Sequence, residues 1–205
     1  MVAGVITGTR WPEHWDSKAE PVDFYDLKSD VDALLALTGD VRAFAFVAAK
    51  HPALHPGQSA RIQRGEAIVG WIGRVHPQLA GQLDLSADSF VFELEFAAIQ
   101  AGTLAAFEPI SRFPSIRRDL AVVVDETLGV AELQAGVEAV AGELLQELLI
   151  FDVYRGKGIE TGRKSIAFGL ILQDYSRTLT EQDIEAVVTQ VTDQLEKKFG
   201  ATLRD

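Results

Sequence analysis

Residues 111–125, SRFPSIRRDLAVVVD, decide the fold that this sequence predicts for its second half. Within residues 118–125, apolar side chains at Leu120, Val122 and Val124 recur at every second position, which is the period of a β-strand with one buried face. Arginines and a Phe-Pro corner precede this strand. Positive charge is therefore concentrated at the start of a strand, in a chain whose formal net charge is -11.

The segments after this strand alternate helices and strands in a recognisable order. Apolar spacing and turn residues predict a helix at 129–141, a strand at 143–156, a strand at 164–174, a helix at 180–200 and a short edge strand at 201–205. Thr180 and Asp183 are expected to cap the second helix, and Gly200 is expected to end it. The complete order is that of the split βαβ, or ferredoxin-like, fold, in which two helices cover one face of an antiparallel sheet.

The strand predicted at 164–174 carries small side chains on the face away from the helices. Ser165, Ala167 and Gly169 alternate with larger apolar residues that are expected to enter the core. Small side chains on an uncovered sheet face allow a ligand to approach the backbone closely. A solvated sheet face without any ligand explains the same alternation equally well.

The first half is expected to form a separate domain, with the boundary between residues 109 and 110. Prolines at 109 and 114 disfavour helix in the residues before them and mark the break. The patterns predict a helix at 26–39 with Leu34, Leu35 and Leu37 inward, a strand at 41–49, a hairpin at 58–75 that turns at Gly65, a short helix at 76–83 and a strand at 88–96. These elements describe a mainly antiparallel α+β unit, and its strand-like beginning is expected to continue from a longer chain.

The composition is that of a globular protein, with 205 residues of which 47% are hydrophobic and 24% charged. The excess of 30 acidic over 19 basic residues argues against indiscriminate binding to nucleic acids, because non-specific affinity comes mainly from phosphate neutralisation. The absence of cysteine excludes disulfides, thiolate metal sites and cysteine nucleophiles. The sequence has neither a secretory signal nor an apolar run long enough to cross a bilayer, so we expect a cytoplasmic protein.

Two pairs of residues have spacings that metal or catalytic sites use. His51 and His55 are four residues apart, but a proline follows each of them and breaks the helix that would align the two rings, so a turn is favoured over a zinc site. Glu93 and Glu95 share one face of a predicted strand, and a solvated face is favoured over a carboxylate pair for acid–base catalysis. The sequence therefore indicates no catalytic residue and no metal ligand.

Basic residues cluster around the strands of the second half. They lie before the first strand, around the loop after the second strand and in the turn before the last helix: Arg112, Arg117, Arg118, Arg155, Lys157, Arg163, Lys164 and Arg177. The first and third strands of the ferredoxin-like fold are neighbours, so some of these cations are expected to ring the uncovered sheet face. A local basic rim of this kind binds phosphates, whereas charged loops of the same composition are also common on solvated surfaces. Both interpretations stay open on the charges alone.

Several long stretches resemble one protein family. SRFPSIRRDLAVVVD (111–125), LLIFDVYRGKGI (148–159), KSIAFGLILQDYSRTLT (164–180) and KKFGATLRD (197–205) are similar to the ferredoxin-fold anticodon-binding domain of bacterial phenylalanyl-tRNA synthetase β subunits. RWPEHWDSKAEPVDFYDLKSDVDALL (10–35), HPALHPGQSARI (51–62) and WIGRVHPQLAGQLDL (71–85) are similar to the catalytic-like domain of the same family. The resemblance covers essentially the whole chain.

This resemblance implies an α+β architecture of two domains. Residues 1–109 would be an incomplete antiparallel domain of the class II synthetase type without catalytic function, and residues 110–205 a βαββαβ anticodon-binding domain. The chain would be the C-terminal part of a β subunit that binds tRNA(Phe) at the anticodon stem-loop and supports assembly with an α subunit in an (αβ)₂ heterotetramer. The α subunit would attach phenylalanine with ATP and Mg²⁺, and no cofactor is expected in this part of the chain.

The resemblance also implies roles for residues of the second domain. The expected tRNA contacts are Arg117, Arg118, Tyr154, Arg155, Lys164, Ser165 and Arg177. Tyr154 would stack on a base, the cations would hold phosphates, and Ser165 would bond to a base edge or a ribose. Two alternatives use the same fold, namely a small-molecule sensor and a purely structural module that holds the subunits together.

Overall fold

The computed structural model describes the chain except for residues 17, 86–87, 101, 103–106, 108–109 and 205. Two compact units, Met1–Phe107 and Glu108–Asp205, divide the chain. Residue 109, at which the first domain was expected to end, lies outside the described residues. In the described part of the chain, no helix is both long and apolar enough to cross a membrane.

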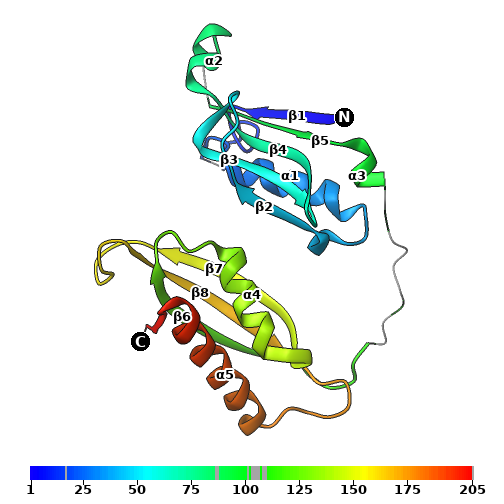
Figure 1. Cartoon of the computed structure of the whole chain (residues 1–205), viewed down its shortest axis with the longest axis vertical. Helices are drawn as coiled ribbons and strands as arrows, with labels where there is room; N and C mark the ends of the chain where they lie inside the picture. Colours follow the sequence, from blue (N-terminus) through cyan, green and yellow to red (C-terminus); the bar gives the residue numbers. More distant parts are fainter. Residues whose placement is uncertain (17, 86–87, 101, 103–106, 108–109, 205) are drawn as a thin grey trace. The chain divides into compact units, whose positions relative to one another are not determined.

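The second unit has the predicted ferredoxin-like order of elements (Figure 1). It consists of β6 (Ile116–Asp125), α4 (Val130–Ala141), the 3-10 turn Gly142–Leu144, β7 (Leu145–Tyr154), β8 (Arg163–Leu172), α5 (Glu181–Phe199) and β9 (Thr202–Leu203). The strands are antiparallel and lie in the order β7-β8-β6-β9. The first and third strands of the unit, β6 and β8, are therefore the central pair, and α4 and α5 lie together on one face of the sheet (Figure 1).

The core of the second unit lies between this sheet and its two helices. Ile166, Phe168 and Leu170 of β8 are fully buried in one apolar cluster with Leu133 of α4 and Leu195 of α5. Each side chain of this size contributes about 1.5–3 kcal/mol when it leaves water. The even-numbered positions of β8 therefore fix which face of the sheet the helices cover.

Helix α5 begins and ends at the residues that the sequence predicted. The Thr180 hydroxyl accepts a hydrogen bond from the Asp183 backbone N–H, and the Asp183 carboxylate accepts one from the Thr180 N–H. Gly200 adopts the left-handed φ of 60° that ends the helix. Gly136 of α4 lets the two helices approach closely, because a β-carbon at this position would lie 2.7 Å from the Phe199 ring.

The first unit is an antiparallel sheet with one long helix on one face. Its elements are β1 (Val2–Thr7), α1 (Phe24–Ala36), the 3-10 turn Val41–Ala43, β2 (Phe44–Ala48), β3 (Leu54–Arg64), β4 (Ala67–Val75), α2 (Pro77–Gln82), β5 (Ser89–Leu94) and α3 (Phe96–Gln100). The strands lie in the order β1-β5-β4-β3-β2, and each neighbouring pair is antiparallel. Leu27, Val31 and Leu35 of α1 share a core with Ile62 and Leu94 of the sheet. The predicted antiparallel α+β architecture is confirmed.

Three details of the first unit differ from the prediction. Leu37 was expected to face inward but is 78% exposed, because α1 ends at Ala36 and Leu37 is its C-cap. The strand expected at 41–49 begins only at Phe44, since the three residues before it form a 3-10 turn. Strand β5 ends at Leu94 and α3 begins at Phe96, so the expected strand over 88–96 is shorter than its pattern suggests.

Candidate nucleic-acid interface

The sheet face opposite α4 and α5, which we call the uncovered face, is formed by alternate residues of β6 and β8. The register places Ala121 opposite Ala167 and Val123 opposite Ser165, and the even-numbered residues of the same strands enter the core. Ser165, Ala167 and Gly169 therefore lie on the uncovered face, as their alternation predicted.

A β-bulge in β7 brings Tyr154 to the uncovered face. The register shifts between Ile150 and Asp152, so that Phe151 is an additional residue in the strand. Strict alternation from the residues before the bulge would turn Tyr154 toward the helices. The shift instead places Tyr154 directly opposite Ser165, so the two residues are cross-strand neighbours on the uncovered face.

An arginine side chain lies against the Tyr154 ring. Arg204 follows β9, and its Cζ atom lies 4.8 Å from the centre of the ring, which is a cation–π contact. Because β6 and β8 lie between β9 and β7, the Arg204 and Tyr154 side chains meet over the two central strands. Ser165 is only 3% exposed although no helix covers it. Side chains of the second unit thus already cover the small residues of this face.

A second arginine lies near the other end of the uncovered face. Arg117 Nε donates to Asp119 Oδ1 at 2.6 Å, and Arg117 Cζ lies 5.1 Å from the centre of the Phe151 ring. Gly169 makes room for this ion pair, because a β-carbon there would lie 2.9 Å from both Arg117 Nε and Asp119 Oδ1. The space beside Gly169 is therefore filled by the ion pair between Arg117 and Asp119 and is not open to a ligand.

Arg118 and Arg155 are engaged by carboxylates of the second unit. Arg118 alternates with Arg117, so it lies on the helix side of the sheet, where its guanidinium pairs with Glu181 at the start of α5. Arg155 follows β7 and places Nε 3.0 Å from Glu126 Oε1. The expected rim is therefore built largely from ion pairs, and a phosphate would have to compete with these carboxylates. Arg118 is therefore not among the cations on the uncovered face, and its expected contact with tRNA stays a prediction.

Lys164 does not reach the uncovered face. Its position opposite Val124 turns the side chain toward the helices, where it is 7% exposed. Its Nζ donates to the carbonyl oxygens of Glu126 at 2.9 Å and Leu128 at 2.7 Å. Burial and the nearby positive charge of Arg155 lower the pKa of Lys164. Lys164 therefore holds the loop that connects β6 to α4, and its expected contact with a phosphate stays a prediction.

Arg177 extends the N-terminal cap of α5. Its Nη1 and Nη2 atoms donate to the Asp183 carboxylate at 2.6 and 2.9 Å. The hydroxyl and the backbone N–H of Thr180 donate to the same carboxylate at 2.6 and 2.8 Å. These hydrogen bonds hold the pKa of Asp183 well below its usual range, and the bonds from Arg177 have the largest effect. Arg177 thus has a structural partner at the start of the helix and does not lie on the uncovered face.

Asp183→Asn should reduce the acid sensitivity of the second unit. Because the folded-state pKa of Asp183 is lowered, its carboxylate stabilises the folded state above the ordinary aspartate pKa, and this stabilisation is lost as the pH falls. The wild-type free energy of unfolding should therefore fall more steeply than that of the variant below about pH 5. Urea denaturation at a series of pH values measures both slopes, and equal slopes would contradict the prediction.

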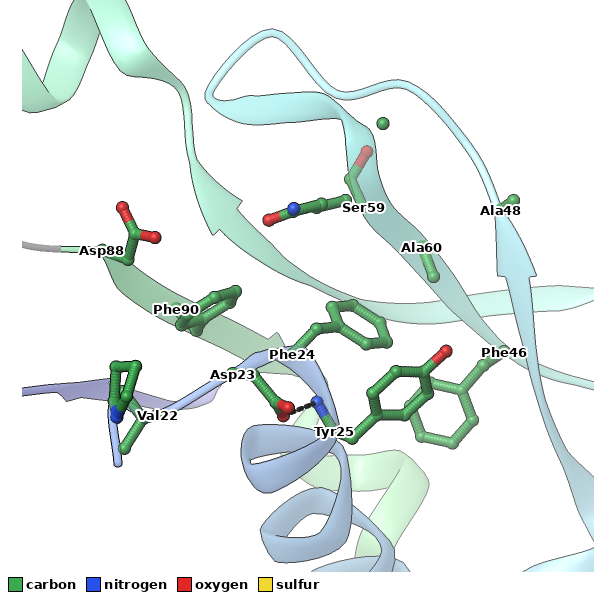
Figure 2. Close-up of a pocket in the computed structure, with 13 residues that line it drawn as sticks. Val22, Asp23, Phe24, Tyr25, Phe46, Ala48, Ser59, Ala60, Asp88 and Phe90 are labelled. Atoms are coloured by element: carbon green, nitrogen blue, oxygen red, sulfur yellow. Dashed lines mark hydrogen bonds between the residues drawn. The ribbon is translucent and has the colours of Figure 1, made fainter. Parts of the chain in front are cut away.

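The first unit contains a cleft of about 660 Å³ beside the N-terminus of α1 (Figure 2). The aromatic rings of Phe24, Tyr25, Phe46 and Phe90 line it. The Asp23 carboxylate at its edge accepts a hydrogen bond from the Tyr25 N–H at 2.7 Å, so it caps the helix (Figure 2). Such a cleft accepts an apolar group, and the described residues that line it show no nucleophile hydrogen-bonded to a base.

The two histidines each accept a backbone hydrogen bond, and the turn that the sequence favoured is present after His51. His51 Nδ1 accepts the N–H of Ala53 at 3.2 Å, and His55 Nδ1 accepts the N–H of Gly57 at 3.1 Å. The His51 imidazole therefore closes a turn, whereas His55 and Gly57 lie within β3. Among the described residues, no three or more His, Asp or Glu side chains converge in a way that could hold a metal ion.

Sequence reasoning missed two residues of the uncovered face. Phe151 reaches the Arg117 guanidinium within a bulge that strict alternation does not reveal. Arg204 follows β9, which is only two residues long, so its alternation carries too little signal to assign a face. The available hint was that Tyr154 and Phe151 are the two aromatic residues of one predicted strand.

Both units match models of known protein families. Residues 111–204 match the family described as the ferredoxin-fold anticodon binding domain. Residues 1–96 match the family described as the phenylalanyl tRNA synthetase beta chain CLM domain. The two matches follow the division of the chain into its two compact units.

The chain is also similar along its length to curated proteins named phenylalanine–tRNA ligase beta subunit. Identity is 47% over 205 residues with the proteins of Idiomarina loihiensis and Vibrio vulnificus, and 45% over 204 residues with that of Pseudomonas fluorescens. Each alignment covers 100% of this chain and 26% of the relative. The chain thus spans about a quarter of the length of the relatives it matches.

Proposed function

We propose that this chain, which belongs to the phenylalanine–tRNA ligase beta-subunit family, binds the anticodon stem-loop of tRNA(Phe) on the uncovered face of its second unit. The observation that carries this proposal is the arrangement of Tyr154, Ser165 and Arg204 on one sheet face, in a domain that matches an anticodon-binding family. Proteins recognise RNA loops by stacking unpaired bases on aromatic rings and by hydrogen bonds to base edges. An aromatic ring beside a hydroxyl and a guanidinium supplies both contacts.

The contact between Arg204 and Tyr154 defines how a base enters. The guanidinium occupies a position over the ring, so a base that stacks there displaces Arg204. Ser165 then becomes accessible to a base edge or a ribose, and the released guanidinium is available to a phosphate. Arg204 therefore acts as a cover of the site in the absence of RNA.

The Phe151 ring provides a second position for a base. Phe151 and Tyr154 lie at and after the bulge of β7 and together span two residues of β8, Ala167 to Ser165, a separation of about 7 Å along the strand. Stacked neighbouring bases are only about 3.4 Å apart, so the two rings suit bases that are splayed out of the stack. Arg117 lies over Phe151 as Arg204 lies over Tyr154, so the two ring positions are built alike.

In the whole enzyme, we propose that this chain is a non-catalytic part of a cytoplasmic (αβ)₂ phenylalanine–tRNA ligase. The second unit would position the tRNA, and the first unit, of the class II synthetase type, would support assembly with the α subunit. The α subunit would attach phenylalanine with ATP and Mg²⁺.

Fluorescence anisotropy with a labelled anticodon stem-loop tests the proposal. We expect the chain to prefer the tRNA(Phe) hairpin over the same hairpin with a changed anticodon, because the rings and Ser165 contact bases. Since most arginines of the second unit are already paired with carboxylates, we expect a shallow salt dependence, with a slope of log K against log salt of about -1 to -2. Equal weak binding to both hairpins that disappears with salt would contradict base recognition on this face.

A further inference from the structure

Residues 201–204, which we call the β9 segment, carry Arg204 to its place over the Tyr154 ring. Strand β9 pairs with β6 over only two residues, and strands in globular proteins are usually longer. The Arg204 N–H also donates to the Ala121 carbonyl at 2.9 Å. Because the ladder is so short, the position of the β9 segment depends on contacts outside it.

The side chain of Arg163 supplies such a contact. Arg163 is the first residue of β8 and follows the alternation of Ser165, so its side chain lies on the uncovered face. Its Nη2 atom donates to the Val123 carbonyl at 2.7 Å and to the Gly200 carbonyl at 2.8 Å. The guanidinium thus joins β6 to the residue that ends α5, immediately before the β9 segment.

Arg163 acts at the point where the chain changes direction. Gly200 has a φ of 60°, and the next residue, Ala201, is buried in the core, so the chain turns here from α5 to the edge of the sheet. A guanidinium presents its N–H donors in a fixed plane and can hold two carbonyl groups at a set separation. Without Arg163, the position of the β9 segment would depend on the two-residue ladder and on the single hydrogen bond of the Arg204 N–H.

We infer that Arg163 is a positioning residue of the RNA site, which holds the β9 segment so that the Arg204 guanidinium lies over the Tyr154 ring. Its consequence for RNA binding rests on the function proposed above. A guanidinium that is held beside the ring is available to a phosphate as soon as a base displaces it. A loosened β9 segment would lose conformational freedom when RNA binds, which weakens binding. Arg163 therefore affects RNA affinity through Arg204.

NMR spectroscopy of the free 205-residue chain with ¹³C-labelled arginine tests the position of Arg204. Its side-chain protons should be shifted upfield by the Tyr154 ring, and Tyr154→Ala, which removes the ring, identifies these signals. Arg163→Met removes both hydrogen bonds to the backbone, so the upfield shifts should be largely lost. Lys197→Met removes a charge from the last turn of α5 and should leave them unchanged. Unchanged shifts in Arg163→Met would overturn the inference, whether or not the chain binds RNA.

Fluorescence anisotropy with the anticodon stem-loop tests the consequence for RNA. Arg163→Met should weaken binding by about 10-fold in the wild-type background, which is the size of one charge-assisted contact. In the Arg204→Ala background the same substitution should cost less than about 2-fold, because a positioning residue acts through the residue that it positions. Arg163→Lys, which can still donate to a carbonyl, should recover part of the affinity.

The remaining outcomes separate this inference from the proposed function. Equal losses in both backgrounds would show that Arg163 contacts RNA directly, and no loss in the wild-type background would show that the position of Arg204 does not matter. Either result overturns the inference. A wild-type chain that does not bind the stem-loop would contradict the proposed function, whereas the NMR shifts of Arg204 decide the role of Arg163 independently of RNA.

Discussion

Replacing Tyr154 by alanine should weaken binding of the cognate anticodon stem-loop by about 5- to 150-fold. This range corresponds to the 1–3 kcal/mol that one base–aromatic stack typically contributes. The ring lies opposite Ser165 on the uncovered face, so its removal deletes the stacking surface next to the only hydroxyl on the central strands of that face. Fluorescence anisotropy at constant salt measures the two dissociation constants.

Two variants control for effects other than stacking. Tyr154→Phe keeps the ring and removes only the hydroxyl, which donates to the Lys157 carbonyl at 3.3 Å, so it should bind nearly as tightly as wild type. Tyr175→Ala removes an exposed tyrosine of the loop before α5 and should have no effect on affinity. The slope of log K against log salt concentration should be the same in all these variants, because none of the substitutions changes a charge. Unchanged affinity of Tyr154→Ala would show that bases are read elsewhere.

The ferredoxin-like order of the second unit could be predicted because its signals are local. The two-residue period of β6 and β8 and the caps of α5 at Thr180 and Gly200 each depend on a few neighbouring residues. Local and long-range preferences agree in these segments, which is typical of sequences that specify one fold. The bulge at Phe151 was not predictable in this way, because it is defined by a change of partner in β8.

The candidate site was predictable only in part. Neighbouring residues of a strand point to opposite faces, so Arg117 and Arg118 cannot both lie on the uncovered face, nor can Lys164 and Ser165. The alternation that identified the strands therefore also predicts that only one residue of each pair lies on the uncovered face. The ionic partners could not be predicted, since Glu181 lies 63 positions from Arg118 in sequence and pairs with it only after α5 has packed on the sheet.

Lys164→Met should lower the free energy of unfolding of the second unit by about 2 kcal/mol, because two carbonyl groups lose a charged donor in a buried site. Methionine keeps an apolar stem of similar length, so the change removes the hydrogen bonds to Glu126 and Leu128 without opening a large cavity. Urea denaturation followed by circular dichroism measures the loss. Tryptophan fluorescence reports the first unit alone, because all three tryptophans lie there, and it should not change.

The pH dependence of this loss distinguishes the buried lysine from an ordinary surface charge. Burial lowers the pKa of Lys164, so the unfolded chain binds more protons at this residue than the folded chain just below the ordinary lysine pKa. The contribution of Lys164 to the free energy of unfolding of the wild type therefore rises with pH in that range. The difference in free energy of unfolding between wild type and Lys164→Met should grow accordingly. Lys157→Met, the same change in the exposed loop after β7, should show neither the deficit nor its growth. Equal stability of Lys164→Met and wild type would mean that the loop between β6 and α4 holds its shape without the lysine, in which case Lys164 would be free to act elsewhere.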